Sequence, residues 1–151
     1  MSAARHRLTG RITVPLPPPE AFELFTPRGE ERWVDGWQPR FAAPSDDDSA
    51  PGTVFETAVH GEETIWVVID RDRGRRVSYA RVTPGSRAGT VSVLLEDDGN
   101  GRSTVEVTYD LTALSPTGDQ RLAELAAGYA DMLTLWESSI STMLAQQNPR
   151  T

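Results

Sequence analysis

The hydrophobic pattern near the end of the chain predicts one long amphipathic helix over about residues 117–147. Large apolar side chains recur there at steps of three and four, which is the spacing of one helix face. They are Leu122, Leu125, Tyr129, Leu133, Trp136, Ile140 and Leu144. Thr117 and Gln120 have the spacing of a capping box. Gly128 does not interrupt the stripe, so we expect a weak point or a close-packing site there rather than a break.

Between residues 53 and 114 the apolar period changes to two, which predicts strands at about 53–60, 63–71, 75–83, 88–97 and 102–114. The connections are short and rich in turn residues, so consecutive strands should form antiparallel hairpins. The segment 65–69 is apolar on both faces. The pattern therefore leaves open whether Trp66 or Val67 points inward, and the outward set is a candidate homodimer surface.

The first third of the chain predicts a strand followed by two short helices and a loop. Residues 6–14 alternate weakly and end at a proline. Prolines 17–19 favour the start of a short helix that ends near Phe25. A second helical piece is expected at 29–34, and 39–52 has the composition of a loop. The whole chain, 1–151, is thus expected to be one α+β domain, in which a curved antiparallel sheet wraps around the long C-terminal helix and leaves a cavity.

Five segments resemble the START-like, or SRPBCC, superfamily: FELFTP at 22–27, ERWVDGW at 31–37, ETIWVV at 63–68, RRVSYARVTP at 75–84 and LTALSP at 111–116. The resemblance covers nearly the whole chain and implies a helix-grip fold with an apolar cavity. The superfamily includes lipid-transfer domains, pollen-allergen-type binders, aromatic polyketide cyclases, ring-hydroxylase subunits and co-chaperones. It therefore implies no single activity. One departure, Asp72-Arg73-Gly74 where relatives often carry Asp-Pro-Pro, concerns hairpin geometry.

Composition narrows the function classes. A net charge of −7 argues against a nucleic-acid or anionic-membrane partner. The chain has no cysteine, and all fifteen of its basic residues are arginine, which excludes disulfides, thiolate catalysis and Schiff-base lysine chemistry. The apolar runs are too short to span a bilayer, and the first residues lack the apolar stretch of a signal peptide. We expect a cytoplasmic protein without membrane insertion.

No residue pattern indicates a catalytic group, a metal site or a cofactor. His6 and His60 fall at a strand start and a hairpin, where ordinary surface residues are expected. Residues 46–48 are three consecutive aspartates without the spacing of a calcium loop, so a solvated acidic loop is favoured. Residues 97–101 have the composition of a hairpin turn.

The ligand-binding candidates are aromatic, apolar and guanidinium side chains, for which core packing is the alternative role. Arg81 shares a strand face with Tyr79, so its charge points inward and needs a partner: Glu106, Glu56 or an acidic ligand group. Trp33 and Trp37 either cover the cavity mouth or fix the loop locally. The candidate set is Trp33, Trp37, Trp66, Tyr79, Arg81, Tyr109, Tyr129, Met132, Leu133 and Trp136.

Three functions fit these expectations. The first is binding of a small hydrophobic or amphipathic molecule in the cavity. The second is a cyclase-type enzyme in which Arg81, Tyr79 or Tyr109 polarises a carbonyl or transfers a proton. The third is a co-chaperone-like module with a functional outer face and a collapsed cavity. Because no distinct acid and base pair is visible, binding is favoured over catalysis.

Overall fold

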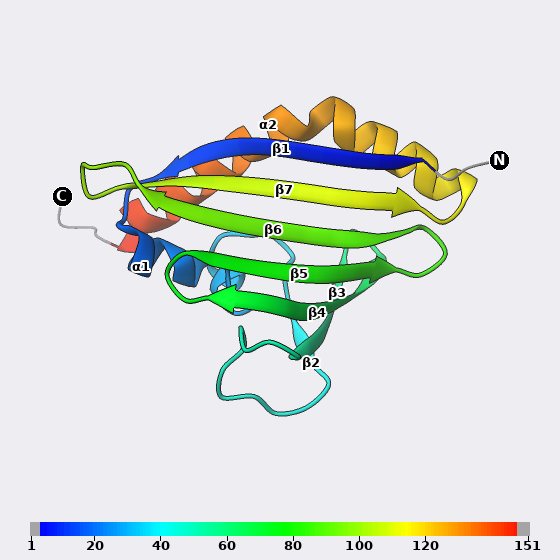
Figure 1. Ribbon diagram of the computed structural model, residues 1–151, viewed down its shortest axis with the longest axis horizontal. Coiled ribbons are helices and arrows are strands. Elements are labelled where there is room, and N and C mark those ends of the chain that lie inside the picture. The colour runs from blue at the N-terminus through cyan, green and yellow to red at the C-terminus, as the bar shows by residue number, and fades with distance from the viewer. Residues whose placement is uncertain (1–3, 148–151) are drawn as a thin grey trace.

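The computed structural model describes residues 4–147, which form a seven-stranded antiparallel sheet with one long helix across it (Figure 1). The strand order is β1-β7-β6-β5-β4-β3-β2, and the sheet is open. The strands are β1 (Arg5–Val14), β2 (Arg40–Phe41), β3 (Val54–Val59), β4 (Glu62–Asp72), β5 (Arg76–Thr83), β6 (Arg87–Asp97) and β7 (Ser103–Ala113). The helices are α1 (Pro18–Phe22), the 3-10 turns η1 (Glu23–Phe25) and η2 (Gly29–Arg32), and α2 (Pro116–Gln147).

The predicted α+β helix-grip arrangement is confirmed, and each predicted strand corresponds to an observed one. The loop predicted at 39–52 contains one short exception, because Arg40 and Phe41 pair with Glu56 and Phe55 of β3. Two residues are too few for a period to be visible in the sequence. The predicted helix 29–34 is a single 3-10 turn, η2.

The predicted capping box of α2 was wrong, and of the two roles expected for Gly128 the close-packing site is excluded. The helix is capped by Ser115, whose Oγ accepts a hydrogen bond from the Gly118 N–H at 3.0 Å, and Pro116 occupies the first helical position. Thr117 is therefore already inside the helix. The close-packed glycine is Gly118, where a Cβ would strike the carbonyl of Ser86, whereas a Cβ at Gly128 would meet no atom within 4 Å. The helix is continuous through Gly128, as expected.

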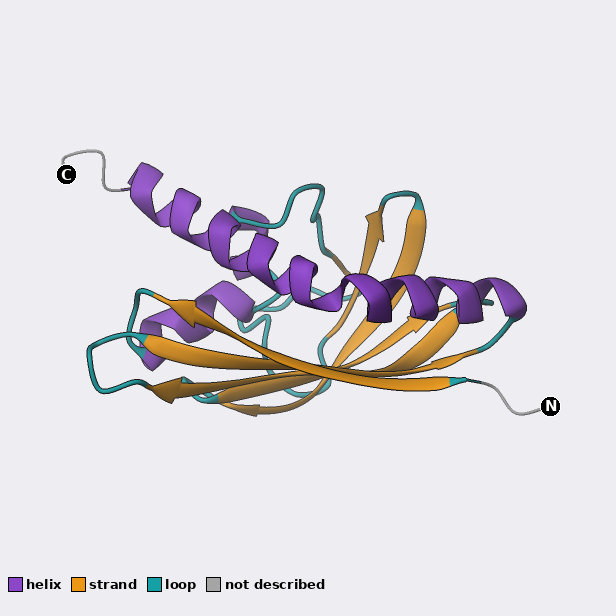
Figure 2. Ribbon diagram, turned by 90° about the horizontal axis from the view of Figure 1, so that it is seen from above, coloured by secondary structure: helices purple, strands orange, loops and turns teal. Residues whose placement is uncertain are grey.

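The helix α2 is fixed to the β1 and β7 side of the sheet. Leu133 packs on β1 where Gly10 has no side chain, and the Tyr129 hydroxyl donates to the Val107 carbonyl at 2.6 Å. Glu137 accepts a hydrogen bond from the Thr13 N–H at 2.6 Å. Figure 2 shows that the β3–β4 hairpin bends out of the sheet toward the side on which α2 lies.

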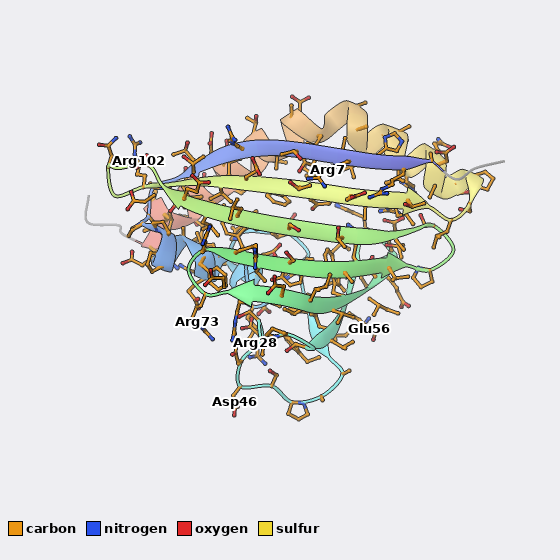
Figure 3. The ribbon with its side chains drawn as sticks, viewed as in Figure 1. Arg7, Arg28, Asp46, Glu56, Arg73 and Arg102 are labelled. Atoms are coloured by element: carbon orange, nitrogen blue, oxygen red, sulfur yellow. The ribbon has the colours of Figure 1, made fainter. Side chains whose placement is uncertain are left out.

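Strand β4 turns Trp66 inward, which answers the question that its sequence left open. Trp66 is 8% exposed, whereas Ile65 and Ile69 are 37% and 49% exposed on the outer face. Val54 and Val82 are also exposed on this face. Val54 pairs with Val67 across the strands, and Val82 pairs with Ile65. Figure 3 shows charged side chains such as Arg7 and Arg73 at the surface. The homodimer through this outer face stays a prediction.

The acidic loop is held by arginines. Asp47 accepts from Arg71 at 2.6 Å and Arg73 at 3.1 Å, and Asp48 accepts the Arg28 N–H at 2.8 Å. Residues 4–147 contain no group of three or more side chains arranged to hold a metal ion. Over the same range, no helix is both long and apolar enough to cross a membrane.

Candidate functional site

A cavity of about 600 Å³ lies between the β3–β4 hairpin, the inner face of the sheet, η2 with the loop after it, and α2. Its aromatic wall consists of Trp37, Trp66, Tyr109 and Trp136. The rings of Trp37 and Trp66 meet edge to face with centroids 5.6 Å apart, and those of Tyr109 and Trp136 are tilted with centroids 6.4 Å apart. Aromatic pairs in such arrangements are stabilised by the relative orientation of their rings as well as by the apolar area that they bury. The wall is therefore a set of mutually supported rings.

The helix α2 contributes a second face to this cavity, next to the stripe that packs on the sheet. Its wall residues recur at steps of three and four: Arg121, Glu124, Leu125, Gly128, Met132 and Trp136. Gly128 lies in the middle of this row, and no described atom lies within 4 Å of the position that a Cβ would take. The absent side chain therefore adds volume to the cavity.

The structure divides the ten candidate residues into two groups. Six line the cavity: Trp37, Trp66, Arg81, Tyr109, Met132 and Trp136. The other four pack in the core beside it: Trp33, Tyr79, Tyr129 and Leu133.

The four core residues are placed by their own partners. Tyr79 donates its O–H to the Phe25 carbonyl at 2.7 Å, and Trp33 donates its indole N–H to the Leu24 carbonyl at 2.7 Å. Tyr129 is hydrogen-bonded to the Val107 carbonyl of β7, and Leu133 lies against Gly10 of β1. The two tryptophans four residues apart thus differ, since Trp33 fixes the short helices while Trp37 lines the cavity and donates to the Pro27 carbonyl at 2.7 Å.

Arg81 brings a charge into this wall and forms no ion pair with a carboxylate among the residues that the structure describes. Its Nε is buried and has no hydrogen-bond partner among residues 4–147, while Nη2 donates to Thr83 Oγ1 at 3.2 Å. Its Cζ lies 4.9 Å from the centroid of the Trp66 ring. Burial lowers the pKa of the guanidinium.

Neither intramolecular partner expected for Arg81 reaches it. Glu106 pairs with Arg11 at 3.2 Å, and Glu56 is exposed at the sheet periphery (Figure 3).

Glu62, an acidic side chain of the wall whose charge acts on Arg81, belongs to another ion pair. Glu62 accepts two hydrogen bonds from Arg87, at 2.8 and 3.1 Å, and lies 3.9 Å from Arg121. The hydrogen bond from Arg87 lowers the pKa of Glu62, so this carboxylate is ionised at neutral pH. Its charge is balanced by Arg87, which leaves the donors of Arg81 available to a ligand.

Tyr109 supplies a neutral hydroxyl next to Arg81. The side chain is 9% exposed and its ring meets the Tyr129 ring edge to face at 5.7 Å. Burial raises the pKa of Tyr109 to about 12, an effect that Arg81 opposes and Glu30 reinforces. At neutral pH Tyr109 is therefore a protonated phenol that can donate a hydrogen bond.

Glu30 is one of the cavity residues that the sequence analysis missed. It lies on η2, is half-buried, and lines the cavity, and its carboxyl group makes no hydrogen bond or ion pair within the described chain. Burial raises the pKa of Glu30 well above its usual range. Val34 and Trp37 also line the cavity and follow at steps of four and seven, but η2 ends at Arg32, so helical spacing is not what brings the three residues together.

No known family profile matches the chain, and no curated protein matches it in sequence. Solved structures match it in fold. A protein of unassigned function from Rhizobium leguminosarum has a TM-score of 0.69 at 16% identity, over 96% of this chain and 97% of that one. Norcoclaurine synthase from Thalictrum flavum, in complex with dopamine and hydroxybenzaldehyde, has a TM-score of 0.66 at 12% identity, over 96% and 89%. DynU16, a protein in the dynemicin biosynthetic locus, has a TM-score of 0.63 at 21% identity, over 90% of this chain and 47% of that one.

Proposed function

From the START-like (SRPBCC) helix-grip fold of this chain, we propose that it encloses a small hydrophobic or amphipathic ligand between the sheet and α2, with Arg81 as the polar anchor. The observation that carries the proposal is the buried Nε of Arg81, which has no partner within residues 4–147 and belongs to a wall of aromatic rings. A cavity of about 600 Å³ is also in the range of small-molecule sites.

The energetics of burying a guanidinium support a ligand that accepts hydrogen bonds. A buried charge without a partner is destabilising, and the contact with the Trp66 ring compensates for it only in part. The edge of the guanidinium keeps a planar fork of donors, which suits a carboxylate, a phenolate or a carbonyl. The apolar wall formed by Trp37, Met132 and Trp136 would take the rest of the molecule.

The test compares Arg81→Met with the wild type for binding of fluorescent fatty acids and polycyclic phenols. Methionine keeps much of the apolar stem and removes the charge. We expect the affinity for acidic ligands to fall about 10- to 100-fold, since hydrogen bonds to charged groups contribute about 1.5–3 kcal/mol. Arg11→Met is the matched control, because Arg11 pairs with Glu106 and its side chain is 71% exposed. Equal binding by Arg81→Met and the wild type would refute the anchor.

Native mass spectrometry of the purified protein is an independent test of the cavity. A retained small molecule of suitable size would support the binding function and identify the ligand. Arg81→Met should then lose that molecule, while Arg11→Met should retain it.

A cyclase-type enzyme that uses the same cavity is the second candidate. It is favoured by the protonated Tyr109 phenol next to Arg81, because two donors near one point could polarise a carbonyl group. Turnover of a polyketide-like substrate, and polyketide synthase genes next to the gene of this protein, would favour it over simple binding. The co-chaperone hypothesis required a collapsed cavity, so the open cavity does not support it.

A further inference from the structure

The short turn η2 holds one carboxyl group, that of Glu30, in the cavity wall. The Glu30 N–H donates to the Thr26 carbonyl at 3.1 Å, and the Glu30 carbonyl accepts from the N–H groups of Trp33 and Val34 at 3.2 and 2.8 Å. Gly29 packs directly on the carbonyl of Glu23, so no larger residue fits there. The backbone on both sides of Glu30 is therefore fixed, and the Glu30 side chain lines the cavity.

The groups around this carboxyl do not favour its ionised form. Tyr79 from β5 and Tyr109 from β7 are near enough that Glu30 raises the pKa of both phenols. The other ionisable groups of the wall are His60, Glu62, Arg81, Arg87, Arg121 and Glu124. None of these six offsets the burial that raises the pKa of Glu30. Burial therefore favours the protonated form of the Glu30 carboxyl group, and that form has one hydrogen to donate.

We propose that Glu30 is a second recognition residue of the cavity, whose neutral carboxyl group donates a hydrogen bond to an uncharged acceptor of the ligand. The inference rests on the proposed binding function and specifies its ligand class. The ligand is an elongated aromatic molecule with an acid, phenol or carbonyl group at Arg81 and a ketone, ether or hydroxyl oxygen at Glu30. A second carboxylate at the far end is disfavoured, because it would place a negative charge beside Glu30, whose own ionised form no cation of the wall stabilises enough to offset burial.

The position of Tyr109 explains how one ligand could reach both groups. Arg81 lowers the pKa of Tyr109 and Glu30 raises it, so the phenol is within electrostatic reach of both. Arg81 comes from β5 and Glu30 from η2, and the Tyr109 ring belongs to the wall that contains both. An aromatic ligand packed along Tyr109 and Trp136 would have its two ends directed at the two polar groups.

The binding test uses rigid fluorescent probes that differ only at the far end: 2-naphthoate, 6-acetyl-2-naphthoate and 2,6-naphthalenedicarboxylate. At neutral pH we expect the wild type to prefer the acetyl probe over 2-naphthoate about tenfold, which corresponds to one satisfied hydrogen bond. The dicarboxylate should bind weakest. Glu30→Leu should reduce the acetyl preference to about twofold or less, and Glu30→Gln should keep it, because the amide is a neutral donor. Glu31→Gln, at the exposed neighbouring position, should behave as the wild type.

Raising the pH should separate the wild type from Glu30→Gln. The wild type should lose its acetyl preference as Glu30 ionises, whereas Glu30→Gln should keep it. The protein without ligand gives a second measurement. A carboxyl group whose folded pKa is raised contributes stability fully below its unfolded pKa, about 4.3, and that stability is lost as pH rises through the folded pKa. Glu30→Gln should therefore become more stable than the wild type as the pH rises, and carbon NMR of the Glu30 carboxyl should show the late titration.

Three results would overturn the inference. If the affinity of the probes depends on Arg81 but not on the group at their far end, the role of Glu30 is refuted and the proposed function stands. Titration of Glu30 near the usual glutamate value would do the same. Absence of binding of every probe to the wild type at any pH would refute the proposed function together with this inference.

Discussion

The guanidinium of Arg81 lies over the indole of Trp66, and the same indole donates its N–H to Thr57 Oγ1 at 2.9 Å. Trp66 is also stacked parallel to Phe55, with ring centroids 5.9 Å apart. The ring that supports the arginine is thus fixed by a hydrogen bond on β3 and by a second ring. Arg81 is consequently held in place before any ligand arrives, which reduces the entropic cost of binding.

Replacing Trp66 should therefore weaken ligand binding through Arg81. Trp66→Leu removes the ring face, and we expect the affinity for acidic probes to fall by about 0.5–2 kcal/mol, the range of a cation–π contact. Trp66→Phe keeps a ring face and should retain most of the affinity. Isothermal titration of both variants with the same acidic probe checks this. Equal affinities for Trp66→Leu and the wild type would show that the ring does not support the arginine.

Leu133 and Trp136 should respond differently to truncation, although both belong to the predicted apolar stripe. Leu133 is 4% exposed and packs on β1, so Leu133→Ala should cost about 2–5 kcal/mol of unfolding free energy. Trp136 is half-buried at the cavity wall, so Trp136→Ala should cost less and should reduce ligand binding. Leu135→Ala, at a 65% exposed position, is the control and should be near neutral. Thermal and chemical denaturation measure these losses of stability. A larger loss for Trp136→Ala than for Leu133→Ala would place Trp136 in the filled core.

The two glycines of α2 should have opposite effects when replaced by alanine. Gly128→Ala enters open space and should stabilise the protein by about 0.5–1 kcal/mol through helix propensity. Gly118→Ala would strike the Ser86 carbonyl and should destabilise. Gly128→Phe should fold but should bind the probes weakly, because its ring occupies the cavity. Binding by Gly128→Phe with unchanged affinity would show that ligands do not use this part of the cavity.

The pattern of the chain predicted the fold closely because the fold depends on period and turn residues. The stripe 117–147 and the alternation in 102–114 were sufficient to place α2 and β7. The pattern could not distinguish residues with the same period but different partners. Tyr79 and Arg81 share a face of β5, yet Tyr79 is bonded to Phe25 while Arg81 reaches the cavity. That difference depends on how η1, which contains Phe25, packs against the sheet. Such tertiary packing cannot be derived from the period of a single strand.

Glu30 shows the same limit for polar residues. Glu30 and Glu31 are adjacent and chemically identical, and both fit an exposed turn. Only the packing of η2 against the cavity makes one of them half-buried and leaves the other exposed. A single 3-10 turn of four residues is too short for a period in the sequence to show which of the two is turned inward.

The three tyrosines of the chain should resist ionisation together in the folded protein. Tyr79, Tyr109 and Tyr129 are all buried, and burial raises the pKa of each, that of Tyr109 to about 12. Because an unfolded tyrosine ionises near 10, the unfolded chain releases protons that the folded chain retains. Stability is then fully present below about pH 10 and falls as the pH rises toward the folded pKa values.

Spectrophotometric titration measures this directly. At about pH 11 the native protein should show little tyrosinate absorbance, and the same sample in denaturant should show ionisation of all three residues. Tyr109→Phe removes one of the three groups and should make the loss of stability above about pH 10 less steep, because fewer protons are linked to unfolding. If one tyrosine of the native wild type ionises near its ordinary pKa and that signal disappears in Tyr109→Phe, then the Tyr109 hydroxyl is solvated. That result would contradict the burial that raises the pKa of Tyr109, although a phenol with the ordinary pKa near 10 is still protonated at neutral pH.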